Sequence, residues 1–218
     1  MEITDLVRKG KSEQYKTFVD GEYVCLLEAE ILVKHHIKTG TNLSQQQFEE
    51  IRKESEKLSC FNVGLSYVSK GLKTKKQAKD NLKQKGYLKS SIDFAIQKLV
   101  DYGYINDKYY AENFIKANSN KKGMIYLKKS LQTKGVSEEI LREVFEDYEE
   151  DQDAIILLAN KYIKNKQKDN STKQKLYRHL LSKGFGFEEC KKAINKVFGG
   201  DDDWDWFGKC RKNKKNSK

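Results

Sequence analysis

The sequence predicts a mainly α-helical protein of three tandem three-helix repeats in an elongated array, with a small N-terminal β-hairpin and helix module. Three observations lead to this fold class. A Lys-Gly pair recurs with Gly86, Gly135 and Gly184, and both intervals are 49 residues. Proline, which interrupts helices, is absent from all 218 residues. Strand-forming patterns are confined to the first 60 residues.

Residues 1–60 are expected to form a small α+β module. Two apolar runs in 14–28 flank Asp20-Gly21, a dipeptide that tolerates the positive φ of a tight turn, and therefore predict a β-hairpin. Residues 29–37 fit either a strand or a short helix. A helix is expected to begin after Ser44, because Ser44 and Gln47 have the spacing of a capping box. The module is too small for a robust core of its own and is expected to pack on the helical region after residue 60.

The repeats are expected at 61–106, 107–150 and 151–200. Apolar residues stand eight and four residues before each of the three glycines, and nine, ten and thirteen residues after it, in all three copies. Each repeat is expected to contain three helices, called a, b and c here. Their predicted ranges are about 61–70, 74–85 and 91–103; 107–118, 122–134 and 138–149; and 152–165, 172–183 and 187–198. The expected N-cap residues are Thr74, Asp107, Ser137 and Ser171.

The Lys-Gly pair is expected to end helix b. A glycine adopts the left-handed φ of a helix C-terminus without steric penalty, and a lysine in the last turn complements the helix dipole. Replacement of any of the three glycines by Val should therefore destabilise its repeat.

No pattern typical of an enzyme is present. Gly10-Lys11-Ser12 resembles the end of a phosphate-binding loop, but Asp5 occupies the position of the required glycine. The four cysteines include no Cys-x-x-Cys pair and the three histidines do not complete a zinc site. Free thiols, the lack of a long apolar run and the lack of a signal-peptide core predict a cytoplasmic protein. We expect no catalytic residue, no cofactor and no metal, and we expect a monomer.

The charge is concentrated in the repeats. The net charge is +11, and the three b segments at 72–86, 120–135 and 171–184 are rich in lysine and nearly free of acidic residues. Equivalent helices of stacked repeats can form a basic stripe that suits an anionic polymer. The alternative is that these lysines are simply solvated. The candidate partner-binding residues are Lys73, Lys75, Lys76, Lys79, Lys83, Lys121, Lys122, Lys128, Lys129, Lys173, Lys175 and Arg178.

Residues 201–218 combine an acidic-aromatic half with a basic end and are expected to be a disordered tail. The alternative is a short docking motif that uses Trp204, Trp206 and Phe207.

Several motifs in the repeats resemble the RecX family of bacterial regulators. They are Lys-x-x-Ala-x-x-x-Leu-x-x-Lys-Gly at 75–86, Leu-x-x-x-Gly-Tyr-Ile-Asn-Asp at 99–107 and Tyr-Ala-Glu-Asn-Phe-Ile at 110–115. The resemblance covers about 61–200, and the hairpin module is similar to the extension of longer members. The long Lys/Asn-rich connection at 164–172 and the acidic-aromatic tail depart from the family pattern.

The resemblance implies a non-enzymatic protein that binds the filament of the RecA recombinase on single-stranded DNA. Such a protein would lower recombination, ATP hydrolysis and the co-protease activity that triggers the SOS response. Weak direct DNA binding would be an additional contact. The competing hypothesis is a nucleic-acid-binding helical-repeat protein that uses the basic helices without the recombinase.

Overall fold

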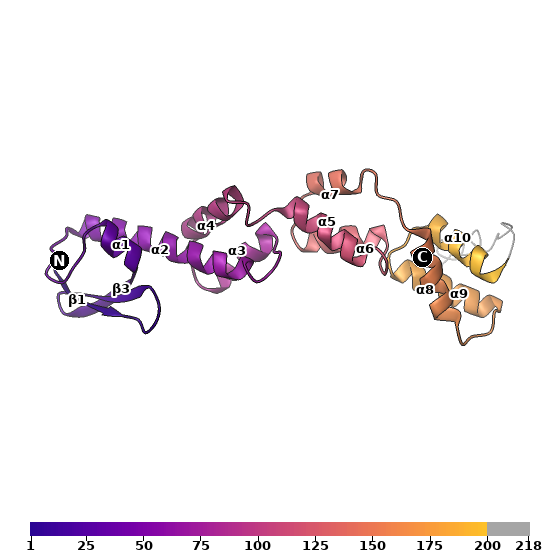
Figure 1. Cartoon of the computed structure of the whole chain (residues 1–218), viewed down its shortest axis with the longest axis horizontal. Helices are drawn as coiled ribbons and strands as arrows, with labels where there is room; N and C mark the ends of the chain where they lie inside the picture. The colour runs from indigo at the N-terminus through magenta and orange to yellow at the C-terminus, as the bar shows by residue number, and fades with distance from the viewer. Residues whose placement is uncertain (200–218) are drawn as a thin grey trace, which may run out of the picture. The chain divides into compact units, whose positions relative to one another are not determined.

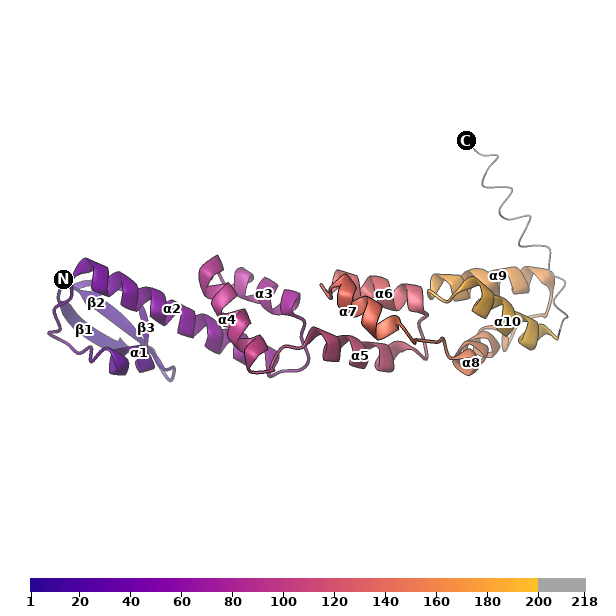
Figure 2. The ribbon, with the colours of Figure 1, turned by 90° about the horizontal axis from the view of Figure 1, so that it is seen from above.

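The computed structural model describes residues 1–199, which contain three strands and ten helices. The chain separates into two compact units, shown from two directions in Figures 1 and 2. Unit 1 contains Met1–Tyr110 and Lys134–Ile140, and unit 2 contains Ala111–Thr133 and the residues from Leu141 onward. The predicted tail at 201–218 lies outside the described residues.

Unit 1 begins with an antiparallel sheet in the order β1-β2-β3. Its strands are β1 (Ile3–Arg8), β2 (Gln14–Val19) and β3 (Glu22–Glu28). The predicted hairpin is confirmed, since Asp20 and Gly21 connect β2 to β3 with φ values of 49° and 89°. The first strand was not predicted, because its short run of mixed polar and apolar residues carries little strand signal before it pairs with β2.

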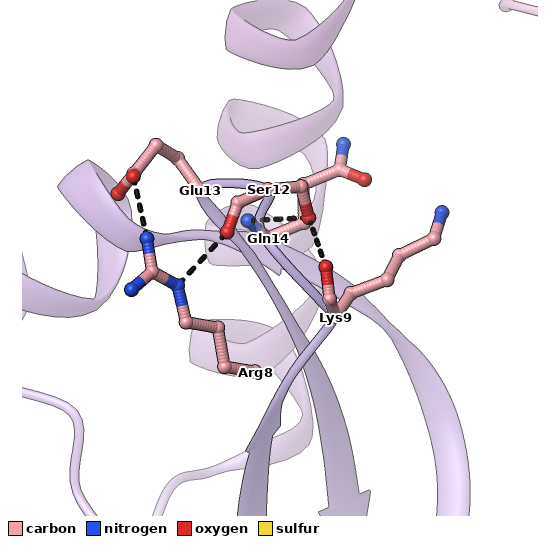
Figure 3. A network of polar contacts seen from close by, with 5 residues as sticks. All are labelled: Arg8, Lys9, Ser12, Glu13 and Gln14. Atoms are coloured by element: carbon pink, nitrogen blue, oxygen red, sulfur yellow. Dashed lines mark hydrogen bonds and ion pairs between the residues drawn. The ribbon is translucent and has the colours of Figure 1, made fainter.

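The segment Gly10-Lys11-Ser12 forms part of the turn between β1 and β2 (Figure 3). The Ser12 hydroxyl donates to the Lys9 carbonyl at 2.7 Å, and the Arg8 guanidinium donates to the Glu13 carboxylate at 2.7 Å. A phosphate-binding loop connects a strand to a helix, whereas this turn connects two antiparallel strands.

Helices α1 (Ala29–Lys34) and α2 (Gln45–Val68) complete the N-terminal region, so the ambiguous segment at 29–37 contains a helix. The capping box of Ser44 and Gln47 is confirmed. The prediction of separate helices on either side of residue 60 is wrong, because α2 continues through this position for 24 residues. Its first half packs on the sheet and its second half packs in the first repeat, so Ser59, Asn62 and Gly64 lie inside the helix without ending it.

The first repeat is a three-helix bundle of α2, α3 (Lys75–Gln84) and α4 (Lys89–Asp101). The Thr74 capping box is confirmed. All five predicted core columns are buried here, and their residues are Ala78, Leu82, Ala95, Ile96 and Leu99. Gly64 of α2 lies against this core, where an added Cβ would stand only 3.0 Å from a Leu99 methyl group.

The second and third repeats each contain three helices near the predicted ranges. They are α5 (Asp107–Asn118), α6 (Met124–Thr133), α7 (Glu138–Phe145), α8 (Gln152–Ile163), α9 (Asn170–Ser182) and α10 (Phe187–Phe198). The third repeat buries the five predicted columns, and its core also contains Phe185 and Cys190. In the second repeat Leu127, Leu131 and Phe145 are buried, whereas Val144 and Tyr148 are half-buried.

Two predicted helix caps are wrong. Asp169 caps α9 by accepting from the Thr172 N–H at 2.7 Å, so Ser171 lies inside the helix. Asn106 accepts from the Tyr109 N–H at 2.9 Å at the start of α5, so Asp107 is already helical. In both cases a neighbouring Asn or Asp competes for the same N–H groups and the local sequence does not decide between them. The Ser137 hydroxyl accepts from the Ile140 N–H at 3.4 Å, which is a weak cap.

The Lys-Gly pair follows helix b in each repeat, as predicted. Gly86, Gly135 and Gly184 have φ values of +85°, +85° and +88°, in the left-handed region that favours glycine. Their surroundings differ. An added Cβ would meet nothing within 4 Å at Gly86, but it would collide with Lys76 at Gly135 and with Tyr126 at Gly184. The last two glycines therefore also permit close packing against the preceding repeat.

The first joint connects the start of α3 to the second repeat and lies within unit 1. The Thr74 hydroxyl donates to the Lys134 carbonyl at 2.6 Å, and the Lys75 N–H donates to the Asp107 carboxylate at 2.8 Å. The backbone at Lys134-Gly135 is thus held against the first turn of α3.

The second joint connects the start of α6 to the third repeat and lies within unit 2. The Gly123 N–H donates to the Lys183 carbonyl and the Ile125 N–H donates to the Gly184 carbonyl, both at 3.1 Å. The Glu150 carboxylate accepts from the Met124 N–H at 2.5 Å and from the Gly186 N–H at 3.1 Å. Both joints therefore combine the start of helix b, a Lys-Gly turn and a carboxylate near the start of the next helix a.

Among residues 1–199, Cys25, Cys60 and Cys190 are free thiols, and burial raises the pKa of Cys60 and Cys190 to about 12. Cys210 lies outside the described residues. None of the described helices has the length and apolar character needed to span a membrane.

Candidate functional site

The twelve predicted partner-binding residues lie on or beside the three b helices α3, α6 and α9, and they differ in exposure. Lys73, Lys79, Lys122 and Lys128 are half-buried and Lys173 is buried. The exposed residues are Lys75, Lys76, Lys83, Lys121, Lys129, Lys175 and Arg178.

On α3, Lys75, Lys79 and Lys83 follow at intervals of four residues and share one face. The Lys79 ammonium lies 3.0 Å from the Asp93 carboxylate of α4, and the hydrogen bond from Lys79 lowers the pKa of Asp93. Its charge is therefore largely compensated. The charge of Lys75 also interacts with the carboxylates of Asp93 and Asp107, whereas no ion pair within the described residues involves Lys83.

Lysines beside aromatic rings occur on and near α6. The Lys122 ammonium lies 4.0 Å from the centre of the Tyr126 ring, and the Lys128 ammonium lies 5.0 Å from that of Phe145. These contacts restrict the side chains but leave the lysines positively charged. Lys121 and Lys129 are exposed.

On α9, Lys173 departs from the predicted solvent-facing surface. It is 8% exposed, its ammonium lies 5.9 Å from the centre of the Phe198 ring, and burial lowers its pKa. Lys173 stands in the first turn of α9, and Phe198 is the last residue of α10. Lys175 and Arg178 remain exposed on this helix.

The basic residues do not form one row of equivalent positions. Aligned on the glycines, the positions of Lys79 and Lys128 correspond to the buried Tyr177 in the third repeat. All three repeats share lysine only in the Lys-Gly pair itself. Each b helix therefore presents its own basic cluster, and a continuous stripe across the repeats remains a prediction.

Sequence reasoning missed a second basic surface, on α2 and α4 of unit 1. Lysines and aromatic rings alternate there at helical spacing, with Lys57 and Phe61 on α2, Phe94 and Lys98 on α4, and Tyr102 at the C-cap of α4. The i to i+4 alternation was present in the sequence. It was not recognised because each of these aromatic residues also fits a core position.

No group of three or more His, Cys, Asp or Glu side chains suited to a metal ion occurs within residues 1–199. The described residues therefore offer two kinds of cationic surface. One is formed by the exposed cations of the b helices, and the other by the lysines and aromatic rings of α2 and α4.

Comparison with known proteins connects these features to one family. The family model described as RecX, third three-helix domain, matches residues 149–194. A regulatory protein RecX from Clostridium beijerinckii is 34% identical over 203 residues, which cover 90% of this chain and 95% of the relative. A regulatory protein RecX from Clostridium botulinum strain Eklund 17B is 32% identical over 202 residues, with coverage of 89% and 95%.

Two solved structures share the fold. The crystal structure of a regulatory protein RecX matches with a TM-score of 0.68 and 19% identity, and covers 92% of this chain and 99% of that chain. The crystal structure of RecX from Lactobacillus salivarius matches with a TM-score of 0.60 and 28% identity, and covers 65% of this chain and 96% of that one.

Proposed function

This chain belongs to the RecX family of regulatory proteins, and we propose that it binds the filament that the RecA recombinase forms on single-stranded DNA. In this role it lowers strand exchange, ATP hydrolysis and the SOS co-protease activity of the recombinase, without catalysing a reaction itself. We further propose that it acts as a monomer in the cytoplasm.

The single observation that carries this proposal is the match to regulatory relatives over about nine-tenths of the chain. The structure supports it with exposed cations on each b helix. A nucleoprotein filament is an anionic polymer, and diffuse contact with such a polymer suits lysine, which binds as a point charge without base readout.

A second candidate function rests on the same cations. Exposed lysines can bind phosphates of bare nucleic acid directly, and the recombinase would then play no part. Salt dependence does not separate the two functions, because both are electrostatic.

The decisive experiment measures the affinity of the protein for bare single-stranded DNA and for a recombinase-coated strand at equal salt, together with ATP hydrolysis by the filament. We expect tighter binding to the coated strand and a lower rate of hydrolysis. Equal or weaker affinity for the coated strand, with unchanged hydrolysis, would contradict the proposal and favour direct nucleic-acid binding.

A charge-matched pair of variants tests the basic clusters. The first variant replaces five exposed b-helix cations by Gln: Lys75, Lys83, Lys129, Lys175 and Arg178. The control replaces five exposed lysines of the N-terminal region by Gln: Lys9, Lys11, Lys16, Lys38 and Lys53. Both variants lose five positive charges. Filament affinity should fall at least about tenfold in the first and change little in the second. Equal losses would show that total charge and not the b helices governs binding.

A further inference from the structure

Helices α2 and α4 carry a surface on which lysines and aromatic rings alternate. Phe94 and Lys98 of α4 and Tyr102 at its C-cap follow one another at intervals of four residues and therefore lie along one face. On α2, Lys57 and Phe61 have the same spacing. The two helices pack side by side in the first repeat, so the two rows are adjacent.

The contacts join these side chains into one group. The Lys98 ammonium lies 5.0 Å from the centre of the Phe94 ring and 5.8 Å from that of Phe61. The Lys57 ammonium lies 5.6 Å from the centre of the Phe94 ring. The Phe61 ring meets Tyr102 edge-on with centres 6.0 Å apart.

Tyr104 extends the group beyond the end of α4. Its ring meets that of Tyr102 edge-on, with centres 6.5 Å apart. We call Lys57, Phe61, Phe94, Lys98, Tyr102 and Tyr104 the aromatic strip.

The core of the repeat does not account for the exposure of these rings. Tyr102 is 60% exposed, Tyr104 54% and Phe94 36%, although Ala95, Ile96 and Leu99 on the same helix are buried. The apolar face of α4 is thus already filled, and the strip lies beside it, along the edge where α4 meets α2. Exposed aromatic residues grouped in this way usually mark a binding surface.

A groove of about 330 Å³ lies beside the strip, and Phe61, Phe94, Lys57 and Lys98 form part of its wall. Its Glu54 carboxylate accepts from Lys34 and from His35, and these hydrogen bonds lower the pKa of Glu54. Within the described residues no carboxylate lies at ion-pair distance from Lys57 or Lys98. Glu30 is the other acidic residue of the groove, so the cations of the strip remain available to an anion.

We propose that the aromatic strip binds single-stranded nucleic acid, with unpaired bases stacked on Phe94, Tyr102 and Tyr104 and phosphates held by Lys57 and Lys98. Flat rings interleaved with cations are the combination by which proteins hold unpaired strands, since every base has a face to stack and every nucleotide carries a phosphate. In a duplex the bases are stacked on one another, so their faces are not accessible to the aromatic rings of the strip. An apolar protein segment fits less well, because it would have to desolvate the lysines that flank each ring.

This surface is separate from the basic b-helix clusters and does not require the recombinase. The second candidate function also involves bare nucleic acid, but through phosphate contacts of the b helices; the strip adds a different surface and the stacking of bases. Binding to the strip and binding to the recombinase filament can each fail while the other stands.

The test measures binding of the full chain to a fluorescent oligo(dT) strand by anisotropy at fixed low salt, without recombinase. The same measurement uses an abasic strand of equal length and a duplex. We expect the oligo(dT) strand to bind at least about tenfold more tightly than the abasic strand. Equal affinity for the abasic strand, or no binding of oligo(dT), would overturn the proposal.

Matched variants locate the surface. The double variant Tyr102→Ala, Tyr104→Ala should bind oligo(dT) about tenfold or more weakly, whereas Tyr102→Phe, Tyr104→Phe keeps the rings and should bind nearly as the parent does. Tyr23→Ala is the control, because Tyr23 is 54% exposed but lies on β3 away from the strip. Lys98→Gln should reduce the slope of log affinity against log salt by about one.

Unchanged affinity of the double Ala variant, or an equal loss in Tyr23→Ala, would contradict the assignment. Thermal unfolding followed by circular dichroism shows whether the double Ala variant is folded. If it is not, the Phe variants still decide the question together with Phe94→Leu, which retains an apolar side chain but removes the ring and should weaken binding.

Discussion

At the first joint a side-chain hydroxyl reaches the carbonyl of Lys134, whereas at the second joint a backbone N–H reaches the equivalent carbonyl of Lys183. The donors, Thr74 and Gly123, occupy the same position of the repeat. Because the donor at Thr74 is a side-chain hydroxyl, the backbone before α3 stays one side chain away from the Lys134-Gly135 turn. Gly123 has no side chain, so the backbone of α6 comes directly against the turn.

The comparison shows which part of the joint is fixed and which part varies. The acceptor is the carbonyl of the Lys-Gly pair in both cases, and the next N–H donates to a carboxylate, Asp107 or Glu150. The donor differs because the hydroxyl of Thr and the backbone N–H of Gly are two ways to satisfy one half-buried carbonyl. In the second and third repeats the Lys-Gly pair is therefore both the end of a helix and the acceptor for the repeat before it.

The largest effect is expected from Gly123→Val, which would break the second joint. The new Cβ would overlap the Gly184 carbonyl and the backbone of Phe185, and main-chain atoms cannot move aside without separating the repeats. The free energy of unfolding should fall by more than about 3 kcal/mol. Urea unfolding followed by circular dichroism measures it. A loss below about 1 kcal/mol would show that the second joint is not closely packed.

When each of the three Lys-Gly glycines is replaced by Ala, the loss in the free energy of unfolding should depend on the atoms that the new Cβ meets. Gly86→Ala carries only the left-handed φ and should cost about 1–2 kcal/mol. Gly184→Ala adds a collision with the Tyr126 backbone, 2.5 Å from the new Cβ, and should cost about 3 kcal/mol. Gly135→Ala should cost about as much as Gly184→Ala, because the nearest atom to the new Cβ is the Cβ of Lys76 at 2.4 Å, which rotation of the lysine side chain does not move. Equal losses in all three would mean that the glycines act only as helix ends.

Thr74→Val should destabilise the first joint by about 2 kcal/mol, since it removes both the N-cap acceptor for α3 and the partner of the Lys134 carbonyl. Thr74→Ser retains the hydroxyl and is the control, with a smaller expected loss. Thermal unfolding of both variants measures the difference. If Ser and Val are equally destabilising, the hydroxyl does not hold this joint.

The smallest effect is expected from Asp107→Asn. Burial raises the pKa of Asp107, and the Lys75 N–H opposes this shift only in part. The folded state therefore holds this proton more tightly than the unfolded state, so stability should increase as the pH falls from above the folded pKa towards the ordinary Asp value of about 3.9. Asn still accepts from Lys75 and should remove this pH dependence, with a change of less than about 1 kcal/mol at neutral pH. Unfolding curves at several pH values test this, and an unchanged pH dependence would contradict it.

Much of the fold was predictable because the relevant signals are local. The apolar columns of the repeat, the caps at Ser44 and Thr74 and the left-handed glycines depend on residues within one or two helical turns. The same reasoning failed where two neighbouring residues can cap the same helix, as at Asp169 and Asn106. It also failed at β1, where pairing with β2 supplies the stability of the strand.

The candidate site was predictable in composition but not in accessibility. The distribution of charge along the sequence predicted cations on the b helices, and seven of the twelve predicted residues are exposed. Sequence could not show that Lys79 faces Asp93 or that Lys173 is buried, because both depend on which helices pack together. For the same reason the aromatic strip was missed: core and surface aromatic residues look alike until Ala95, Ile96 and Leu99 are seen to fill the core side of α4.

The sequence by itself determined the three repeats, their register, the helix ends at Lys-Gly and the basic character of the b helices. These follow from periodicity, backbone preference and charge, which act over short distances along the chain. Only the tertiary structure decided that α2 is one helix and that Lys-Gly turns join successive repeats. It also decided which lysines and rings face solvent. Such features arise from residues far apart in sequence, such as Thr74 and Lys134, which are 60 positions apart and meet only after the chain has folded.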